Sequence, residues 1–261
     1  MIGFLIRKSF YDLWDNLFKI VVLNFGFAAC MAIPFLPVIA KKLFVSNALG
    51  MIVTFFGILV CSVYLAAAAF SLRVISDYGA FSFGEFFKSF KVALPAGLVM
   101  GGFVIFMIIV LPVVFRFYGN MNPPIAGLAL SAVIFWTMIF ALLSFQYYFS
   151  VYARLGSSIK KSFKKCILIS MDNTGFSIFL ILHNIIALSF SLLLVFILFP
   201  GPVGVLLFTD EALRLRLLKY DWLEENPDAN RKKIPWDALL IEEREKTGTR
   251  SLKNFIFPWK Y

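Results

Sequence analysis

Five long stretches without a charged side chain are separated by short segments rich in lysine and arginine. The stretches cover residues 20–40, 43–72, 92–115, 117–153 and 173–209. An α-helix needs about 20 apolar residues to cross the ~30 Å hydrocarbon core of a bilayer, and each stretch is that long. The pattern therefore predicts an all-α, polytopic membrane protein with five long transmembrane helices.

The end of the fifth stretch and the residues that follow it predict one further, shorter helix. Residues 203–218 follow a Pro-Gly-Pro turn and include Asp210, Glu211 and Arg214. Such a helix rises only about 24 Å, so a crossing would require surrounding protein or a thinned bilayer. We expect this short sixth crossing because it returns the C-terminal tail, with its many basic residues, to the cytoplasmic side.

The distribution of basic residues predicts that both termini are cytoplasmic. With the N-terminus inside, 11 basic residues that flank the five long spans lie in the cytoplasm, whereas Lys41, Lys42 and Arg116 lie outside. The formal net charge is +10. Positive charge next to membrane spans favours contact with anionic lipids, so we expect the bilayer, including such lipids, to be the first partner.

Amphipathic segments precede each pair of predicted spans. Apolar and charged positions alternate with a helical period over residues 1–19, 83–91 and 155–167, as is typical of helices that lie on a membrane surface. Residues 88–91 and 161–164 both read Lys-Ser-Phe-Lys. These observations predict a transmembrane domain over residues 20–218 that is built from three helical hairpins, each preceded by an amphipathic surface helix.

Composition and motifs exclude several classes of function. Hydrophobic residues make up 61% of the chain, against about 45–50% in soluble domains. The sequence has no RNA-binding module and no catalytic or metal-binding motif, so we expect no nucleic-acid partner, enzyme activity, metal or cofactor. The cysteines show no paired spacing and are interpreted as buried apolar side chains. They are Cys30, Cys61 and Cys166.

Polar residues at membrane depth form the candidate site. His183 and Asn184 lie in the fifth stretch, and Asp210, Glu211 and Arg214 lie in the short sixth helix. A tight turn between the two helices would let these groups face one another, with His183 titrating against an acidic partner. The alternative is structural: Asp210 and Arg214 form an i, i+4 pair, and His183 and Asn184 make hydrogen bonds between helices.

Residues 219–261 predict a cytoplasmic tail of different character. Pro235 opens a short helix over residues 236–246. The last ten residues are too aromatic for a solvated terminus, so we expect the tail to dock on the bilayer interface, on the protein's own surface helices or on a partner protein. The docking side chains that we expect are Trp236, Phe255, Phe257 and Trp259.

Three short sequences carry a resemblance to a known family. Residues 86–91 read Phe-Phe-Lys-Ser-Phe-Lys, residues 153–156 read Ala-Arg-Leu-Gly, and residues 199–202 read Phe-Pro-Gly-Pro. Over residues 12–220 the chain resembles the YesL-like family of bacterial multi-pass membrane proteins, a family of unknown function. The resemblance implies a place in the bacterial cytoplasmic (inner) membrane and an accessory role beside sugar-uptake systems.

Two functions remain open at this point. The first is a non-enzymatic accessory or scaffold protein that contacts a membrane transport complex for a carbohydrate or another solute. The second is a small transporter or permease with a polar site between the fifth and sixth helices. A continuous polar cavity at His183 would favour transport, whereas a solid apolar core with a conspicuous tail surface would favour the accessory role.

Overall fold

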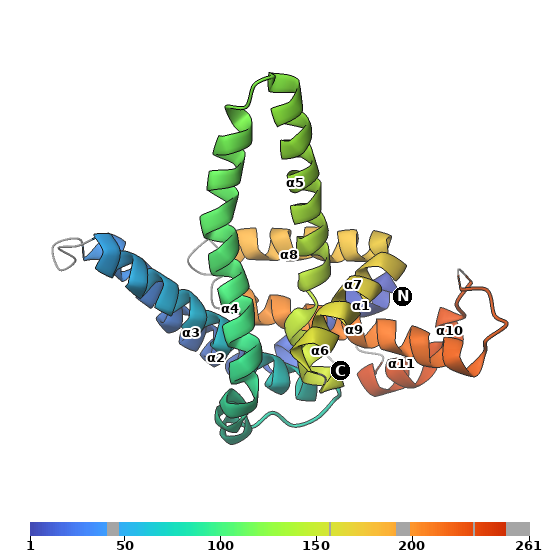
Figure 1. Cartoon of the computed structure of the whole chain (residues 1–261). Helices are drawn as coiled ribbons and strands as arrows, with labels where there is room; N and C mark the ends of the chain where they lie inside the picture. The colour runs from blue at the N-terminus through green and yellow to red at the C-terminus, as the bar shows by residue number, and fades with distance from the viewer. Residues whose placement is uncertain (41–46, 157, 192–198, 232, 249–261) are drawn as a thin grey trace.

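The computed structural model describes residues 1–40, 47–156, 158–191, 199–231 and 233–248. Throughout these residues the chain forms helices and no strands, which confirms the all-α class for the described part (Figure 1). The helices are α1 (Ile2–Asp15), α2 (Leu17–Ile39), α3 (Asn47–Ser76), α4 (Phe83–Gly119), α5 (Pro124–Phe145), α6 (Tyr148–Leu155), α7 (Ile159–Asp172), α8 (Thr174–Ser191), α9 (Gly201–Glu225), α10 (Trp236–Leu239) and α11 (Ile241–Thr247).

Five segments are long and apolar enough to cross a membrane, in agreement with the sequence. They are α2, α3, α4, the α5–α6 segment and α8. Between 6% and 39% of the most hydrophobic part of each is buried inside the protein. In a soluble domain, apolar helices pack against each other and bury most of their apolar surface. The five helices therefore support a multi-pass, membrane-embedded protein.

The pair α4 and α5 is the most exposed part of the molecule. These two helices contact each other and project together from the rest of the molecule, toward the top of Figure 1. Only 11% of the α4 window and 6% of the α5–α6 window are buried. Helix α4 is continuous from Phe83. The separate surface helix expected over residues 83–91 is therefore wrong, because those residues form the first turns of a long helix.

Glycine and alanine allow α3 to pack closely on its neighbours. A Cβ atom at Gly57 of α3 would lie 2.4 Å from Pro34 Cδ in α2, and one at Gly97 of α4 would lie 2.4 Å from Val63 Cα in α3. The alanines at positions 66–69 of α3 are buried in the core. Small residues at such positions let helix backbones approach each other, so here they serve contacts within the chain.

Helix α9 lies at the centre of the molecule and is largely buried. It packs against α1, α2, α3, α6 and α8, and 14 of its 25 residues are buried. Asn24 of α2 fixes its start: Asn24 Oδ1 accepts a hydrogen bond from the Val203 N–H (3.0 Å), and Asn24 Nδ2 donates one to the Pro200 carbonyl (2.9 Å). A side-chain acceptor for a backbone N–H at the start of a helix stabilises its first turn.

The expected short sixth crossing is not supported. Helix α9 is absent from the helices that are apolar enough to span a membrane, because charged residues occur along it. It also continues to Glu225, so the predicted boundary between membrane domain and tail at residue 218 falls inside a helix. Two of the three expected surface helices do exist as separate helices, namely α1 and α7. The threefold hairpin repeat stays a prediction.

Candidate functional site

Charged residues from five segments meet in one place, which we call the ionic cluster. The cluster is centred on Asp210 and Glu211 of α9, whose side chains are 0% and 1% exposed. Carboxylates are rarely buried to this degree unless they are paired. Its members are Lys8 and Asp12 of α1, Ser76 at the end of α3, Asp77, Arg154 of α6, Asp210, Glu211 and Arg214 of α9, and Glu243 of α11.

Asp210 is held by Arg154 in a two-point contact. Arg154 Nε donates to Asp210 Oδ1 at 2.9 Å, and Nη2 donates to Oδ2 at 2.5 Å. The same guanidinium donates to Asp77 Oδ1 (2.9 Å) and to Ser76 Oγ (2.8 Å). A planar guanidinium bonded at two points fixes both distance and orientation. The i, i+4 pair expected between Asp210 and Arg214 is therefore wrong, because Arg154 takes the carboxylate.

Lys8 joins α1 to the cluster. Its ammonium donates to the Asp12 carboxylate and to the Ser76 carbonyl (3.0 Å), and it lies 3.6 Å from Glu211 Oε1. The ammonium also lies 4.4 Å from the centre of the Tyr78 ring, a distance at which the ring face attracts a cation. Sequence reasoning missed Lys8 because it was assigned to the exposed face of a surface helix.

Glu211 is the least satisfied member of the cluster. Neither of its carboxyl oxygens receives a hydrogen bond from the described residues. Burial raises the pKa of Glu211 well above its usual range, an effect that Lys8 opposes and the nearby Asp12 carboxylate reinforces. In the neutral form, the Glu211 hydroxyl would donate to Asp12, which removes the unmet hydrogen bond. The raised pKa of Glu211 therefore follows from its burial without a hydrogen-bond donor.

Arg214 connects the C-terminal segment to the same place. It donates to Glu243 Oε1 of α11 at 2.7 Å and to the Ser76 carbonyl, and it lies 3.5 Å from Asp77. Its guanidinium carbon is 5.1 Å from the centre of the Tyr78 ring. One side chain thus contacts the end of α3 and the tail helix together.

The tail docks on the protein's own helices over its described part. The Tyr78 hydroxyl lies 2.9 Å from Glu243 Oε2 and 3.1 Å from Thr247 Oγ1, and Arg7 of α1 donates to the Gly248 carbonyl at 3.1 Å. The predicted helix over 236–246 is split into α10 and α11 at the buried Leu240. The expected docking residues Phe255, Phe257 and Trp259 lie outside the described residues.

A second polar cluster joins α7 to α9 and was also missed. Lys219 donates to Asp172 Oδ2 (2.8 Å) and to Asn173 Oδ1 (2.9 Å), and Arg216 donates to Asn173 Oδ1 (3.1 Å). Partial burial acts to raise the pKa of Asp172, but the hydrogen bond and charge of Lys219 lower it overall. Arg216 also stacks on Phe176 and lies 5.4 Å from the Trp236 ring, so Trp236 docks within the chain.

His183 and Asn184 have different neighbours from those expected. The His183 ring stacks on Phe208 with 3.6 Å between ring centres, and Asn184 donates to Thr209 Oγ1 at 3.1 Å. The expected contact of His183 with Asp210 or Glu211 is absent from the described residues, where Nδ1 of His183 faces Asn184 at 3.4 Å. The interhelical hydrogen bond expected of Asn184 is confirmed, and it ties α8 to α9.

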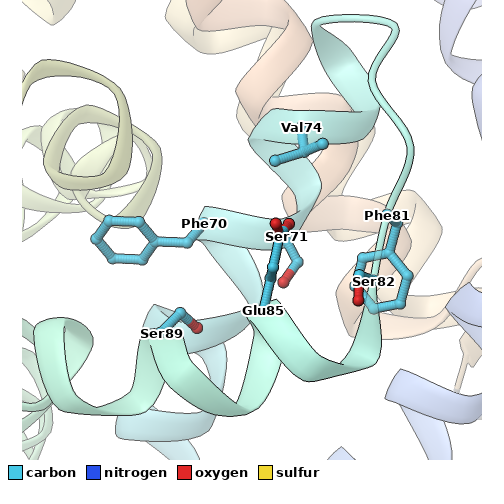
Figure 2. A pocket seen from close by; sticks show the side chains of 7 residues that line it. All are labelled: Phe70, Ser71, Val74, Phe81, Ser82, Glu85 and Ser89. Carbon is cyan, nitrogen blue, oxygen red and sulfur yellow. The ribbon is translucent and has the colours of Figure 1, made fainter.

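Two pockets lie beside these clusters. One has a volume of about 170 Å³ and lies next to His183, between α1, α8 and α9. The other has about 220 Å³ and lies between the last turns of α3 and the first turns of α4 (Figure 2). Its lining residues are Phe70, Ser71, Val74, Phe81, Ser82, Glu85 and Ser89. Within the described residues, no group of three or more His, Cys, Asp and Glu side chains is placed to bind a metal ion.

Comparison with known proteins gives no match: no family model, no curated protein and no solved structure matches this chain.

Proposed function

We propose that this chain is a non-enzymatic accessory or scaffold protein of a bacterial cytoplasmic membrane, associated with a complex that takes up a carbohydrate or another solute. The observation that carries the proposal is the attachment of α11 to the ionic cluster through Glu243 and Arg214. This attachment fixes α11, the last described helix of the tail, against the helices. The resemblance to the YesL-like family supports the same role.

The contacts within the ionic cluster support a particular membrane topology. Lys8 precedes every candidate span, Asp77 follows two of them, and Arg154 lies in the last turn of the fourth. These residues touch one another or share the partner Ser76, so they lie on one side of the bilayer. We infer that α2, α3, α4 and α5 each cross once. Glu211 and Glu243 belong to the same cluster and therefore lie on the same side of the bilayer. The chain between Arg154 and Glu243, which contains α8 and α9, must then cross the bilayer an even number of times.

The basic residues assign this side to the cytoplasm. Lys160, Lys161, Lys164 and Lys165 lie on α7, between Arg154 and α8. Segments rich in lysine beside spans are retained in the cytoplasm. Both termini are then cytoplasmic, and the tail is available to a cytoplasmic or membrane-bound partner.

A transport path is less well supported than an accessory role. The carboxylates Asp210 and Asp77 are occupied by Arg154, and the pocket at His183 is lined mainly by apolar side chains. Passage of a polar solute would need polar groups along a continuous route. The described residues provide an apolar core around a paired ionic cluster, which suits a fixed scaffold.

The test is affinity purification from the native membrane in a mild detergent. Full-length protein is compared with a chain that ends at Gly248, which keeps the α11 attachment and removes the aromatic end. We expect the membrane subunit of a solute-uptake transporter to co-purify with the full chain and to be lost from the shortened one. A full-length Glu242→Gln variant serves as the control, since Glu242 is exposed. Recovery of no transporter subunit with the full chain contradicts the proposal.

A further inference from the structure

The pocket beside His183 is a groove whose two walls come from helices far apart in the chain. Helix α1 forms one wall, α8 forms the other, and the first two turns of α9 form the floor. Its lining residues are Ile6, Ser9, Phe10, Leu13, His183, Ala187, Pro200, Gly204, Val205 and Phe208. None of these described residues carries a carboxylate, an ammonium or a guanidinium group, so the groove offers no charged partner to a charged solute.

Gly204, on α9 at the floor of the groove, leaves space there because it has no side chain. A Cβ atom at Gly204 would lie 2.8 Å from Pro200 Cβ and 3.1 Å from Leu13 Cδ2. The groove encloses about 170 Å³. An engineered apolar cavity of about 150 Å³ is known to stay dry and to bind benzene. The groove therefore has room for a short hydrocarbon segment of about six carbon atoms.

Two polar groups interrupt the apolar lining. The Ser9 hydroxyl belongs to a side chain that is 2% exposed, and it has no hydrogen-bond partner among the described residues. A helical serine ordinarily bonds back to its own backbone or points to solvent, so an unpartnered buried hydroxyl calls for an acceptor. The His183 ring is fixed by its stack on Phe208, and its Nδ1 faces Asn184, which leaves Nε2 for a second contact.

The surroundings decide the kind of ligand. Helix α8 is a candidate membrane span, and the side chains of Ile6 on α1 and of Leu182 and Ile186 on α8 are exposed. A groove between such helices takes its occupant from the lipid phase. We propose that it binds one acyl chain of a membrane phospholipid, with Ser9 donating a hydrogen bond to the ester carbonyl at the end of that chain.

Photolabelling tests the site directly. The protein is reconstituted in phosphatidylglycerol vesicles that contain a small fraction of the same lipid with a diazirine on one acyl chain, and the labelled peptides are mapped by mass spectrometry. We expect preferential labelling of the α1 and α8 peptides that contain Ser9 and Ala187. The Ala187→Leu variant fills the groove and should reduce this labelling by about tenfold, equivalent to about 1.4 kcal/mol. Ala129→Leu, on the exposed face of α5, should leave it unchanged.

The Ser9→Ala variant keeps the groove and removes only the hydroxyl. One hydrogen bond corresponds to a loss of about two- to tenfold in labelling, whereas Ser189→Ala, whose hydroxyl bonds to the Ile185 carbonyl on the exposed face of α8, should have no effect. Equal labelling of Ala187→Leu and unaltered protein overturns the proposal. So does labelling of the groove by diazirine-bearing free palmitic acid but not by the phospholipid. Folding of each variant is checked by size-exclusion chromatography.

Discussion

The α4–α5 pair and helix α9 place their side chains in opposite ways. In α4 and α5 the apolar side chains face outward, with little of either helix covered by protein. In α9 four charged side chains are buried, and those of Asp210 and Glu211 are almost completely covered. A soluble protein would reverse both arrangements. The difference teaches that the first region is suited to a lipid environment, while the second is a protein interior held by ion pairs between segments far apart in the chain.

The largest effect should come from removing one partner of a buried pair. Arg154→Ala leaves Asp210 buried without its two hydrogen bonds. Loss of one partner of a buried ion pair costs about 3–5 kcal/mol of folding free energy. We expect the variant to aggregate or to melt far below the unaltered protein in detergent, as measured by size-exclusion chromatography after heating.

Arg244→Ala is the matched control for Arg154→Ala. Arg244 also binds an aspartate at 2.8 Å, but this partner, Asp237, has a side chain that is 94% exposed. Exposed ion pairs contribute at most about 1 kcal/mol. Equal melting temperatures for Arg154→Ala and Arg244→Ala would show that the ionic cluster is not a buried, stabilising contact.

The second prediction tests whether lipid covers α5. Val133 lies on α5 and is 63% exposed. On the surface of a soluble protein, Val133→Lys would change stability by no more than about 0.5 kcal/mol. Near the centre of a transmembrane helix, lysine costs about 2.5–3.5 kcal/mol of insertion free energy. We expect a clear drop in the membrane-inserted fraction, measured by alkaline extraction. Ile241→Lys, at an exposed position of α11, should insert normally, and equal behaviour of the two variants would contradict lipid exposure of α5.

The sequence predicted the apolar helices well because hydropathy is a local property. Runs of apolar residues located α2, α3, α4 and α5 to within a few turns. The fifth run began within one residue of α8 but also included the uncharged first turns of α9. The error over residues 83–91 has the same origin. An amphipathic segment and the span that follows it have compatible helical periods, and α4 continues through Pro95, so the two form one helix.

The ionic cluster could not be derived in the same way. Asp210 and Glu211 were identified because charges in an apolar setting need partners. Their partners, Arg154 and Lys8, are 56 and 203 positions away in the chain, and only tertiary packing brings them together. The sequence offered instead the nearest candidates, Arg214 at i+4 and His183 across a turn. Comparing the number of carboxylates in apolar surroundings with the number of basic groups nearby in the sequence would have helped, since buried carboxylates need basic partners from some segment of the chain.

A smaller effect is expected where the tail meets the cluster. Glu243→Gln keeps the size of the side chain but weakens the hydrogen bonds to Arg214 and Tyr78. Hydrogen bonds to charged groups contribute about 1.5–3 kcal/mol. We expect faster cleavage of α10 and α11 by trypsin while the remaining helices stay protected. The neighbouring Glu242→Gln changes an exposed carboxylate instead, and faster cleavage in both variants would contradict a specific attachment through Glu243.

The smallest effect concerns the proton on Glu211. Burial raises the pKa of this carboxyl from its usual value of 4.5, so the folded state binds more protons than the unfolded state above about pH 4.5. Stability from this group is therefore highest at low pH and declines as pH rises toward the raised pKa, by at most about 1.4 kcal/mol per pH unit. Glu211→Gln cannot titrate, so its stability relative to the unaltered protein should increase with pH. Thermal melting at several pH values between about 5 and 8 measures this difference. A difference that stays constant over that range would mean that Glu211 is ionised throughout and that Lys8 alone balances its charge.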